Sequence, residues 1–129
     1  MVKMKRMKYR LITAIYSIII LIITSTPANH IPRIQILHFD KFVHFSIYFV
    51  FGFLLLMAVI EQWSPGGFAG IFISLLIGTT FGAIDEFHQF WIVSRVPSFG
   101  DFFADLGGLI VGILLMFFMI LYRYVRVKL

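Results

Sequence analysis

Four long apolar runs divide the chain, and almost every charged residue lies at the end of a run rather than inside one. The runs cover residues 11–26, 42–60, 68–84 and 102–122. A helix of about 17 to 25 apolar residues spans the hydrocarbon core of a bilayer and satisfies its own backbone hydrogen bonds. We therefore expect an all-α polytopic membrane protein, with four transmembrane helices in a compact bundle. We expect residues 1–129 to form a single domain.

Composition excludes most soluble functions. Hydrophobic residues make up 60% of the chain and charged residues 13%, whereas a soluble domain carries about 25% charged residues. The chain has no cysteine, which removes disulfides and thiolate chemistry. Because the basic residues gather at the two termini beside apolar runs, we expect contacts with membrane lipids and no nucleic-acid partner.

The distribution of lysine and arginine predicts the orientation. Five precede or enter the first run and three follow the last, whereas only Arg33, Lys41 and Arg95 lie between. The positive-inside rule then places both termini in the cytoplasm, with the chain crossing the cell membrane several times. The first run is short, and Ala28 lies near a possible signal-peptidase site, so both a cleaved and an uncleaved first span remain open. The orientation is the same in either case.

Polar residues enter three of the runs at helical spacing. Asp40, His44 and Tyr48 follow one another at steps of four, and similar steps recur at the end of the third run and the start of the fourth, in line with glycines. An ionisable group within a span costs about 2.5 to 3.5 kcal/mol, so such faces turn toward other helices or a cavity. With the predicted topology, the three faces form one outward-opening pocket. Its candidate ligand-binding residues are Asp40, Lys41, His44, Tyr48, Asp85, Glu86, Gln89, Arg95, Ser98, Asp101 and Asp105.

Some of these residues have simpler interpretations. Asp40 and Asp101 are suited to cap helix N-termini, and the segment from Ser98 to Asp101 is similar to a capping box with Asp in place of Glu. His44 is more often an interhelical hydrogen-bonding histidine than a ligand.

Capping does not explain the adjacent pair Asp85 and Glu86. They lie at the end of the third run, where the helix dipole disfavours anions, or inside that helix if it continues further. The pair needs Lys41 and Arg95 as partners, a bound cation, or a proton on one carboxyl. No cofactor is predicted, but a divalent cation is compatible with oxygen and imidazole ligands. The candidate metal ligands are His44, Asp85, Glu86 and Asp101.

The order of these motifs resembles the VanZ-like family of small bacterial membrane proteins, named for an accessory protein of glycopeptide (teicoplanin) resistance. The matching pieces, within residues 40–112, are Asp40-Lys41-x-x-His44-Phe45 with Tyr48 and Gly52, Gly82-x-x-Asp85-Glu86-x-x-Gln89, and Arg95-x-x-Ser98-x-x-Asp101 with Gly108 and Gly112. The chain departs from the pattern at Asp105, where many relatives have Asn. The resemblance implies a multi-pass protein linked to envelope or antibiotic phenotypes, and it does not imply a reaction.

Three functions remain open from the sequence. The acid-rich pocket suits an ammonium or cation-bridged ligand, such as a lipid headgroup, a cell-wall precursor or the polar part of a glycopeptide. Alternatively, an intramembrane hydrolase or transferase acts on a lipid-linked substrate, using a metal or a general base beside a phosphate clamp of Arg95 and Lys41. In the third interpretation the charges only lock the helices together. The oligomeric state is left open.

Overall fold

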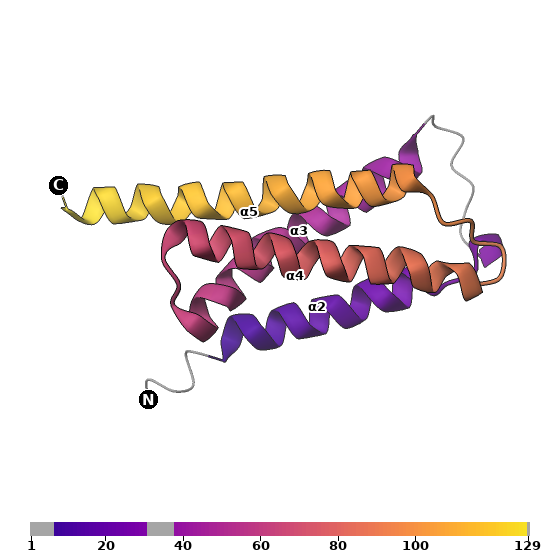
Figure 1. Cartoon of the computed structure of the whole chain (residues 1–129), viewed down its shortest axis with the longest axis horizontal. Helices are drawn as coiled ribbons and strands as arrows, with labels where there is room; N and C mark the ends of the chain where they lie inside the picture. Colours follow the sequence, from indigo (N-terminus) through magenta and orange to yellow (C-terminus); the bar gives the residue numbers. More distant parts are fainter. Residues whose placement is uncertain (1–6, 31–37, 129) are drawn as a thin grey trace.

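The computed structural model describes residues 7–30 and 38–128, which form four long helices and two short 3₁₀ segments (Figure 1). No strand occurs in these two ranges. The predicted all-α bundle of four helices is confirmed. The elements are α2 (Lys8–Thr24), η1 (Ala28–His30), α3 (Phe39–Trp63), α4 (Gly67–His88), η2 (Gln89–Trp91) and α5 (Phe99–Lys128).

Three of these helical segments are long and apolar enough to cross a bilayer: Phe39–Trp63, Gly67–Trp91 and Phe99–Lys128. With 17 residues, α2 lies at the lower end of the length that a span needs. Large apolar side chains point outward over much of the bundle, and Phe68 and Phe99 are 84% and 86% exposed. Water disfavours such a surface, whereas lipid chains solvate it. The fold is therefore that of a polytopic membrane bundle.

The helices α3, α4 and α5 are each longer than the apolar run from which they were predicted. The third run ends at residue 84, but α4 continues to His88 and carries Asp85 and Glu86 inside its last turn. Similarly, α3 ends only where Ser64 adopts a left-handed conformation, with φ of 48°, directly before a proline. Hydropathy marks the part of a helix that contacts lipid, whereas backbone geometry and proline decide where the helix ends.

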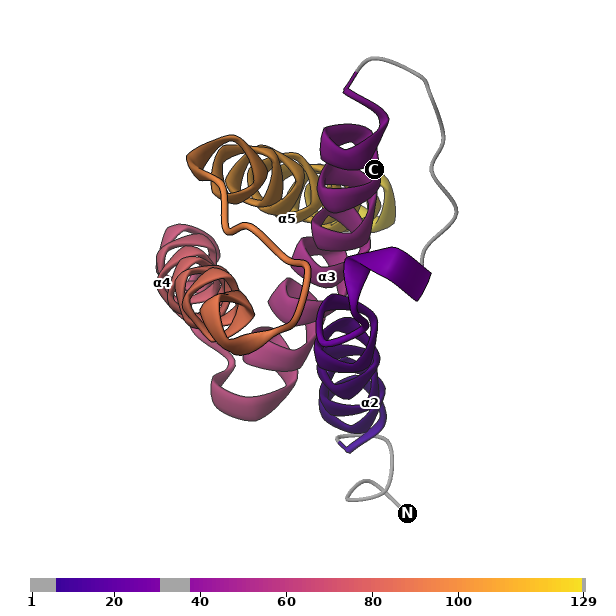
Figure 2. The ribbon, with the colours of Figure 1, turned by 90° about the vertical axis from the view of Figure 1, so that its right-hand side faces the viewer.

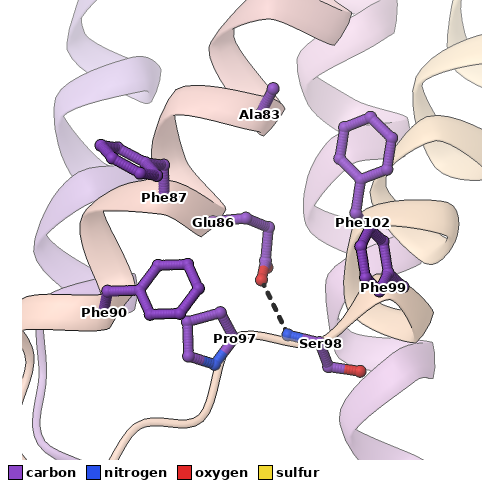
Figure 3. Close-up of a pocket in the computed structure, with 8 residues that line it drawn as sticks. All are labelled: Ala83, Glu86, Phe87, Phe90, Pro97, Ser98, Phe99 and Phe102. Carbon is purple, nitrogen blue, oxygen red and sulfur yellow. Dashed lines mark hydrogen bonds between the residues drawn. The ribbon is translucent and has the colours of Figure 1, made fainter.

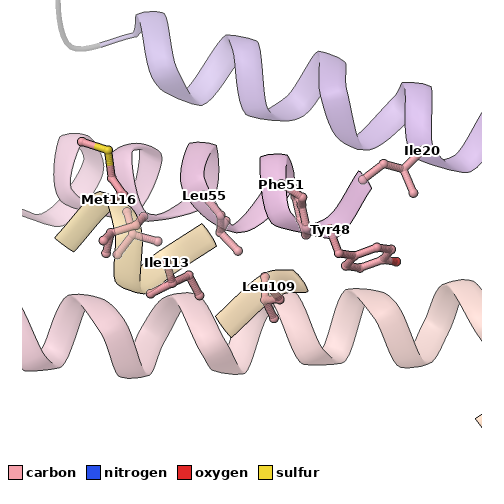
Figure 4. Packing of buried hydrophobic residues seen from close by; sticks show 9 residues of the cluster. Ile20, Tyr48, Phe51, Leu55, Leu109, Ile113 and Met116 are labelled. Carbon is pink, nitrogen blue, oxygen red and sulfur yellow. The ribbon is translucent and has the colours of Figure 1, made fainter. Parts of the chain in front are cut away.

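The helix α3 lies at the centre of the bundle and contacts each of the other three helices, while α4 also contacts α5 (Figure 2). Buried apolar side chains fill these contacts, among them Phe51 of α3 and Leu109 and Ile113 of α5 (Figure 4). In contrast, α4 buries mainly small residues, such as Gly78 and Gly82. Small residues let this helix approach the bulky core of α3 and α5 closely.

The closest helix contact is between α3 and α5. A Cβ atom on Gly108 would overlap the carbonyl oxygen of Phe45, and one on Gly112 would overlap that of Phe49. In the reverse sense, a Cβ atom on Gly52 of α3 would overlap the carbonyl oxygen of Leu109 of α5. The two backbones therefore touch through glycine, and two glycines four residues apart on one helix are a common basis for such close contacts.

This contact predicts that two adjacent glycines of α5 respond differently to alanine. We expect Gly108→Ala to destabilise the bundle by about 1 to 3 kcal/mol or more, because the added methyl group forces two backbones apart. Gly107→Ala should be neutral or stabilising by up to about 1 kcal/mol, because its Cβ meets only the Phe45 ring at ordinary contact distance, 3.6 Å, and alanine favours a helix. Thermal unfolding of both variants in detergent micelles measures the difference. Equal midpoints would contradict the assigned contact.

Candidate functional site

Polar side chains from all four long helices gather at one end of the bundle. At this end α2 and α4 end while α3 and α5 begin, and the loop from Ile92 to Ser98 crosses over it (Figures 1 and 2). We call these side chains the polar cluster. It consists of Thr24 of α2, Lys41, His44 and Tyr48 of α3, Asp85 and Glu86 of α4, Gln89 of η2, Ser98 of the loop, and Asp101 and Asp105 of α5.

Two side-chain pairs join α3 to α5 within the cluster. Lys41 Nζ donates to Asp101 Oδ1 at 2.9 Å, and about one turn further along both helices His44 Nδ1 lies 2.9 Å from Asp105 Oδ1. The spacing of the pairs follows from residues three or four apart lying on the same helix face. Both pairs involve residues of α5 that precede Gly108, where the two backbones touch. The glycine contact therefore sets the distance that the two pairs span.

Asp85 connects three helices through hydroxyl groups. It is fully buried, Thr24 Oγ1 donates to its Oδ1 at 2.7 Å, and Tyr48 Oη donates to its Oδ2 at 3.3 Å. Lys41 and Arg95 were the partners considered from the sequence, but both donate elsewhere. Hydroxyl donors satisfy the carboxyl without the cost of burying a second charge. Thr24 was missed because it closes an apolar run and has no helical spacing to the other polar residues.

The next residue, Glu86, contacts different partners from those of Asp85. Its Oε1 accepts from Gln89 Nε2 at 3.2 Å, and its Oε2 accepts from the backbone N–H of Ser98 at 3.3 Å (Figure 3). In the predicted capping box, the side chain of Asp101 would bond the N–H of Ser98. That half of the box is wrong, because Glu86 reaches this N–H from α4. The other half remains: Ser98 Oγ accepts from the N–H of Gly100 at 3.1 Å, in the first turn of α5.

Arg95 and Asp40 lie at the rim of the cluster. Arg95 Nε donates to the carbonyl oxygen of Thr26 at 3.0 Å and its Nη2 to that of Ile23 at 3.2 Å, so the guanidinium binds two backbone carbonyls at and just beyond the C-terminus of α2. Asp40 is not the N-cap of α3, because His38 holds that position. The Asp40 side chain is 62% exposed and accepts from Lys41 at 2.8 Å. Lys41 and Arg95 therefore bond to different parts of the bundle rather than to one shared clamp.

An apolar pocket of about 290 Å³ adjoins the cluster between α4 and α5. In Figure 3, Phe87 and Phe90 approach it from one side and Phe99 and Phe102 from the other. Glu86 and Ser98 are the two members of the polar cluster that line it. The members of each pair are three residues apart, and the two pairs flank the loop. The lining residues are Ala83, Glu86, Phe87, Phe90, Pro97, Ser98, Phe99 and Phe102.

Three of the candidate metal ligands come from three different helices and meet. His44, Glu86 and Asp101 each offer one ligand atom, and these atoms all lie within 4.8 Å of one another. The fourth candidate, Asp85, is bonded to Thr24 and Tyr48 instead. The two adjacent carboxylates of α4 thus have separate positions, one inside the helix contacts and one beside the pocket.

A family model described as VanZ/LLP1 matches residues 2–122. The chain belongs to the VanZ/LLP1 family. Comparisons with curated proteins and with solved structures find no significant match. The VanZ/LLP1 match confirms the resemblance that the motifs indicated, and it extends past the motif-bearing residues 40–112 to include α2. In this VanZ-like membrane protein, the part beyond the motifs supplies Thr24, the hydroxyl donor to Asp85.

The Asp85 contacts predict a specific sensitivity at Thr24. We expect Thr24→Val to destabilise the bundle by about 1 to 3 kcal/mol, because it removes a donor to a buried carboxyl while keeping the shape of the side chain. Thr80→Val is the matched control, since the exposed Thr80 hydroxyl donates only to the carbonyl of Leu76 within its own helix. It should change stability by less than about 0.5 kcal/mol. Denaturant unfolding in micelles compares the two, and similar losses would remove Thr24 from the cluster.

Proposed function

We propose that this VanZ-like protein binds an amphiphile in the pocket between α4 and α5, and that this binding contributes to tolerance of glycopeptides of the teicoplanin type. The ligand is a membrane lipid, a cell-wall precursor or the drug itself. Its apolar part occupies the phenylalanine-lined pocket, and its polar part, carrying an ammonium group or a bridging cation, lies against Glu86. The observation that carries the proposal is the position of this carboxylate in the wall of an otherwise apolar pocket.

The chemistry of the pocket matches an amphiphile better than a polar solute. Four phenyl rings and Pro97 supply apolar surface, and binding sites of this kind use a few polar groups to orient the ligand. Phe87 and Phe90 are 61% and 67% exposed, so their rings remain available for contact. A ligand whose apolar part covers these rings removes their surface from contact with water, and this burial contributes favourably to the binding free energy.

The charge of the cluster favours a cationic group. The polar cluster contains four carboxyl groups, those of Asp85, Glu86, Asp101 and Asp105. Lys41 is paired with Asp101, and His44 contacts Asp105. In the described part of the chain, Arg95 donates to backbone carbonyls rather than to any of these carboxyl groups. Membership of the VanZ/LLP1 family supports the link to glycopeptides at the level of the family. The positive-inside pattern supports an outward-facing pocket in the cell membrane, with both termini in the cytoplasm.

Filling the pocket tests the proposal. We expect Ala83→Trp to lower the affinity for a fluorescent amine-bearing lipid about tenfold or more, because the indole ring occupies the space between α4 and α5. In bacteria that express the chain, the same change should return teicoplanin tolerance to the level of the empty vector. Ala69→Trp is the control, because Ala69 is an exposed residue near the other end of α4.

The outcome is clear if the amount of folded protein in the membrane is measured for each variant. Full teicoplanin tolerance and unchanged lipid affinity in a folded Ala83→Trp variant would reject the pocket as the binding site. Equal losses in both tryptophan variants would show a general effect of the larger side chain rather than occupation of the pocket.

A hydrolase or transferase acting on a lipid-linked substrate is the second candidate function. The observation that favours it is the contact of His44 with the buried carboxylate of Asp105, since an imidazole oriented by a carboxylate is a common general base. Release of phosphate from a lipid-linked pyrophosphate by the purified chain measures this activity. The absence of turnover by folded wild-type protein would reject the enzyme and leave the binding proposal standing.

A further inference from the structure

Besides the apolar pocket, the strongest candidate is the set of His44, Glu86 and Asp101, which shares Glu86 with the pocket lining. Each comes from a different helix, and their ligand atoms lie within 4.8 Å of one another. Around one cation with bonds of about 2.0 to 2.2 Å, neighbouring ligand atoms lie about 3 to 4 Å apart. Small side-chain movements therefore bring these three atoms to bonding distance of a single ion.

Other residues of the cluster hold the three side chains in place. Asp105 contacts His44 at Nδ1, which fixes the ring and leaves Nε2 as the atom that a metal takes. Glu86 accepts from Gln89 and from the Ser98 backbone. Hydrogen bonds of this kind orient metal ligands in proteins, and a carboxylate is one of the usual partners of a metal-bound histidine.

A separate observation also indicates a cation at this place. Asp105 is 1% exposed, and within the described ranges its Oδ2 is buried without a hydrogen-bond partner. This oxygen belongs to the carboxyl group whose other oxygen contacts Nδ1 of His44, one of the three candidate ligands. A buried carboxylate oxygen without a donor is costly, and a nearby positive charge offsets that cost.

We propose that His44, Glu86 and Asp101 bind one divalent cation of the first transition series, such as Zn²⁺ or Mn²⁺, with Asp105 as the residue that positions His44. The imidazole distinguishes this set from the all-oxygen sites that Ca²⁺ and Mg²⁺ prefer. Two carboxylates balance the charge of the ion. Three protein ligands leave coordination positions open for water.

The proposal does not depend on the amphiphile or on any reaction. Direct metal binding to the purified full-length chain in detergent micelles tests it, after chelator treatment and exchange into metal-free buffer. We expect Zn²⁺ or Mn²⁺ to bind with one ion per chain in titration calorimetry, and the unfolding temperature to rise with metal concentration. Ca²⁺ should bind much more weakly.

Matched variants locate the ion. His44→Asn keeps an N–H donor for Asp105 but lacks Nε2, and it should abolish binding, as should Glu86→Gln. Asp105→Asn should weaken binding about 10- to 100-fold, as expected for loss of an outer contact to a ligand. His88→Asn and Asp40→Asn are controls, because both residues are exposed and outside the set of three; they should bind metal like the wild type.

Metal-free unfolding curves first establish that each variant is folded. If His44→Asn fails to fold, Glu86→Gln and Asp105→Asn still test the site. The proposal is overturned if the wild type binds neither Zn²⁺ nor Mn²⁺, if only Ca²⁺ binds, or if folded ligand variants bind as tightly as the wild type. Ala83→Trp separates the two proposals, since it should lose amphiphile binding and keep the metal.

Discussion

The contact between the backbones of α3 and α5 is the constraint on which the rest of the structure depends. Gly108 and Gly112 allow the carbonyl groups of α3 to lie where a side chain would otherwise be. Because the helices touch there, the preceding turn of α5 faces the first turns of α3 at hydrogen-bonding distance. The Lys41–Asp101 and His44–Asp105 pairs follow directly. A wider separation would leave the same four side chains without these partners.

The structure gives two adjacent carboxylates different physical roles. Successive residues of a helix point about 100° apart, so neighbours in sequence face different surroundings. Asp85 turns to Thr24 and Tyr48 and ties α2, α3 and α4 together with hydroxyl donors. Glu86 turns toward α5 and the pocket, where its partners are an amide and a backbone N–H. The structural interpretation of the charges therefore applies to Asp85, and the binding proposal rests on Glu86.

The basic residues of this end help to position the helices. Arg95 binds two backbone carbonyls at and just beyond the C-terminus of α2, and Lys41 bridges α3 and α5. Glu86 lines the pocket, and Asp105 Oδ2 has no hydrogen-bond partner among the described residues. Both groups can therefore accept a further contact. Both groups are acidic, and Glu86 also lies beside the aromatic surface of the pocket. We therefore propose two ligands, an amphiphile with a cationic group and a divalent cation.

The sequence alone determined the all-α membrane fold and most of the polar residues at one end, because apolar run length and four-residue spacing depend only on helix geometry and on lipid as solvent. It also showed the family motifs around His44. Only the tertiary structure decided which donor meets which acceptor: Thr24 rather than Lys41 or Arg95 on Asp85, and Glu86 rather than Asp101 on the Ser98 backbone. It also revealed the phenylalanine pocket. Such pairings depend on the rotation and depth of packed helices, which no periodicity within one helix specifies.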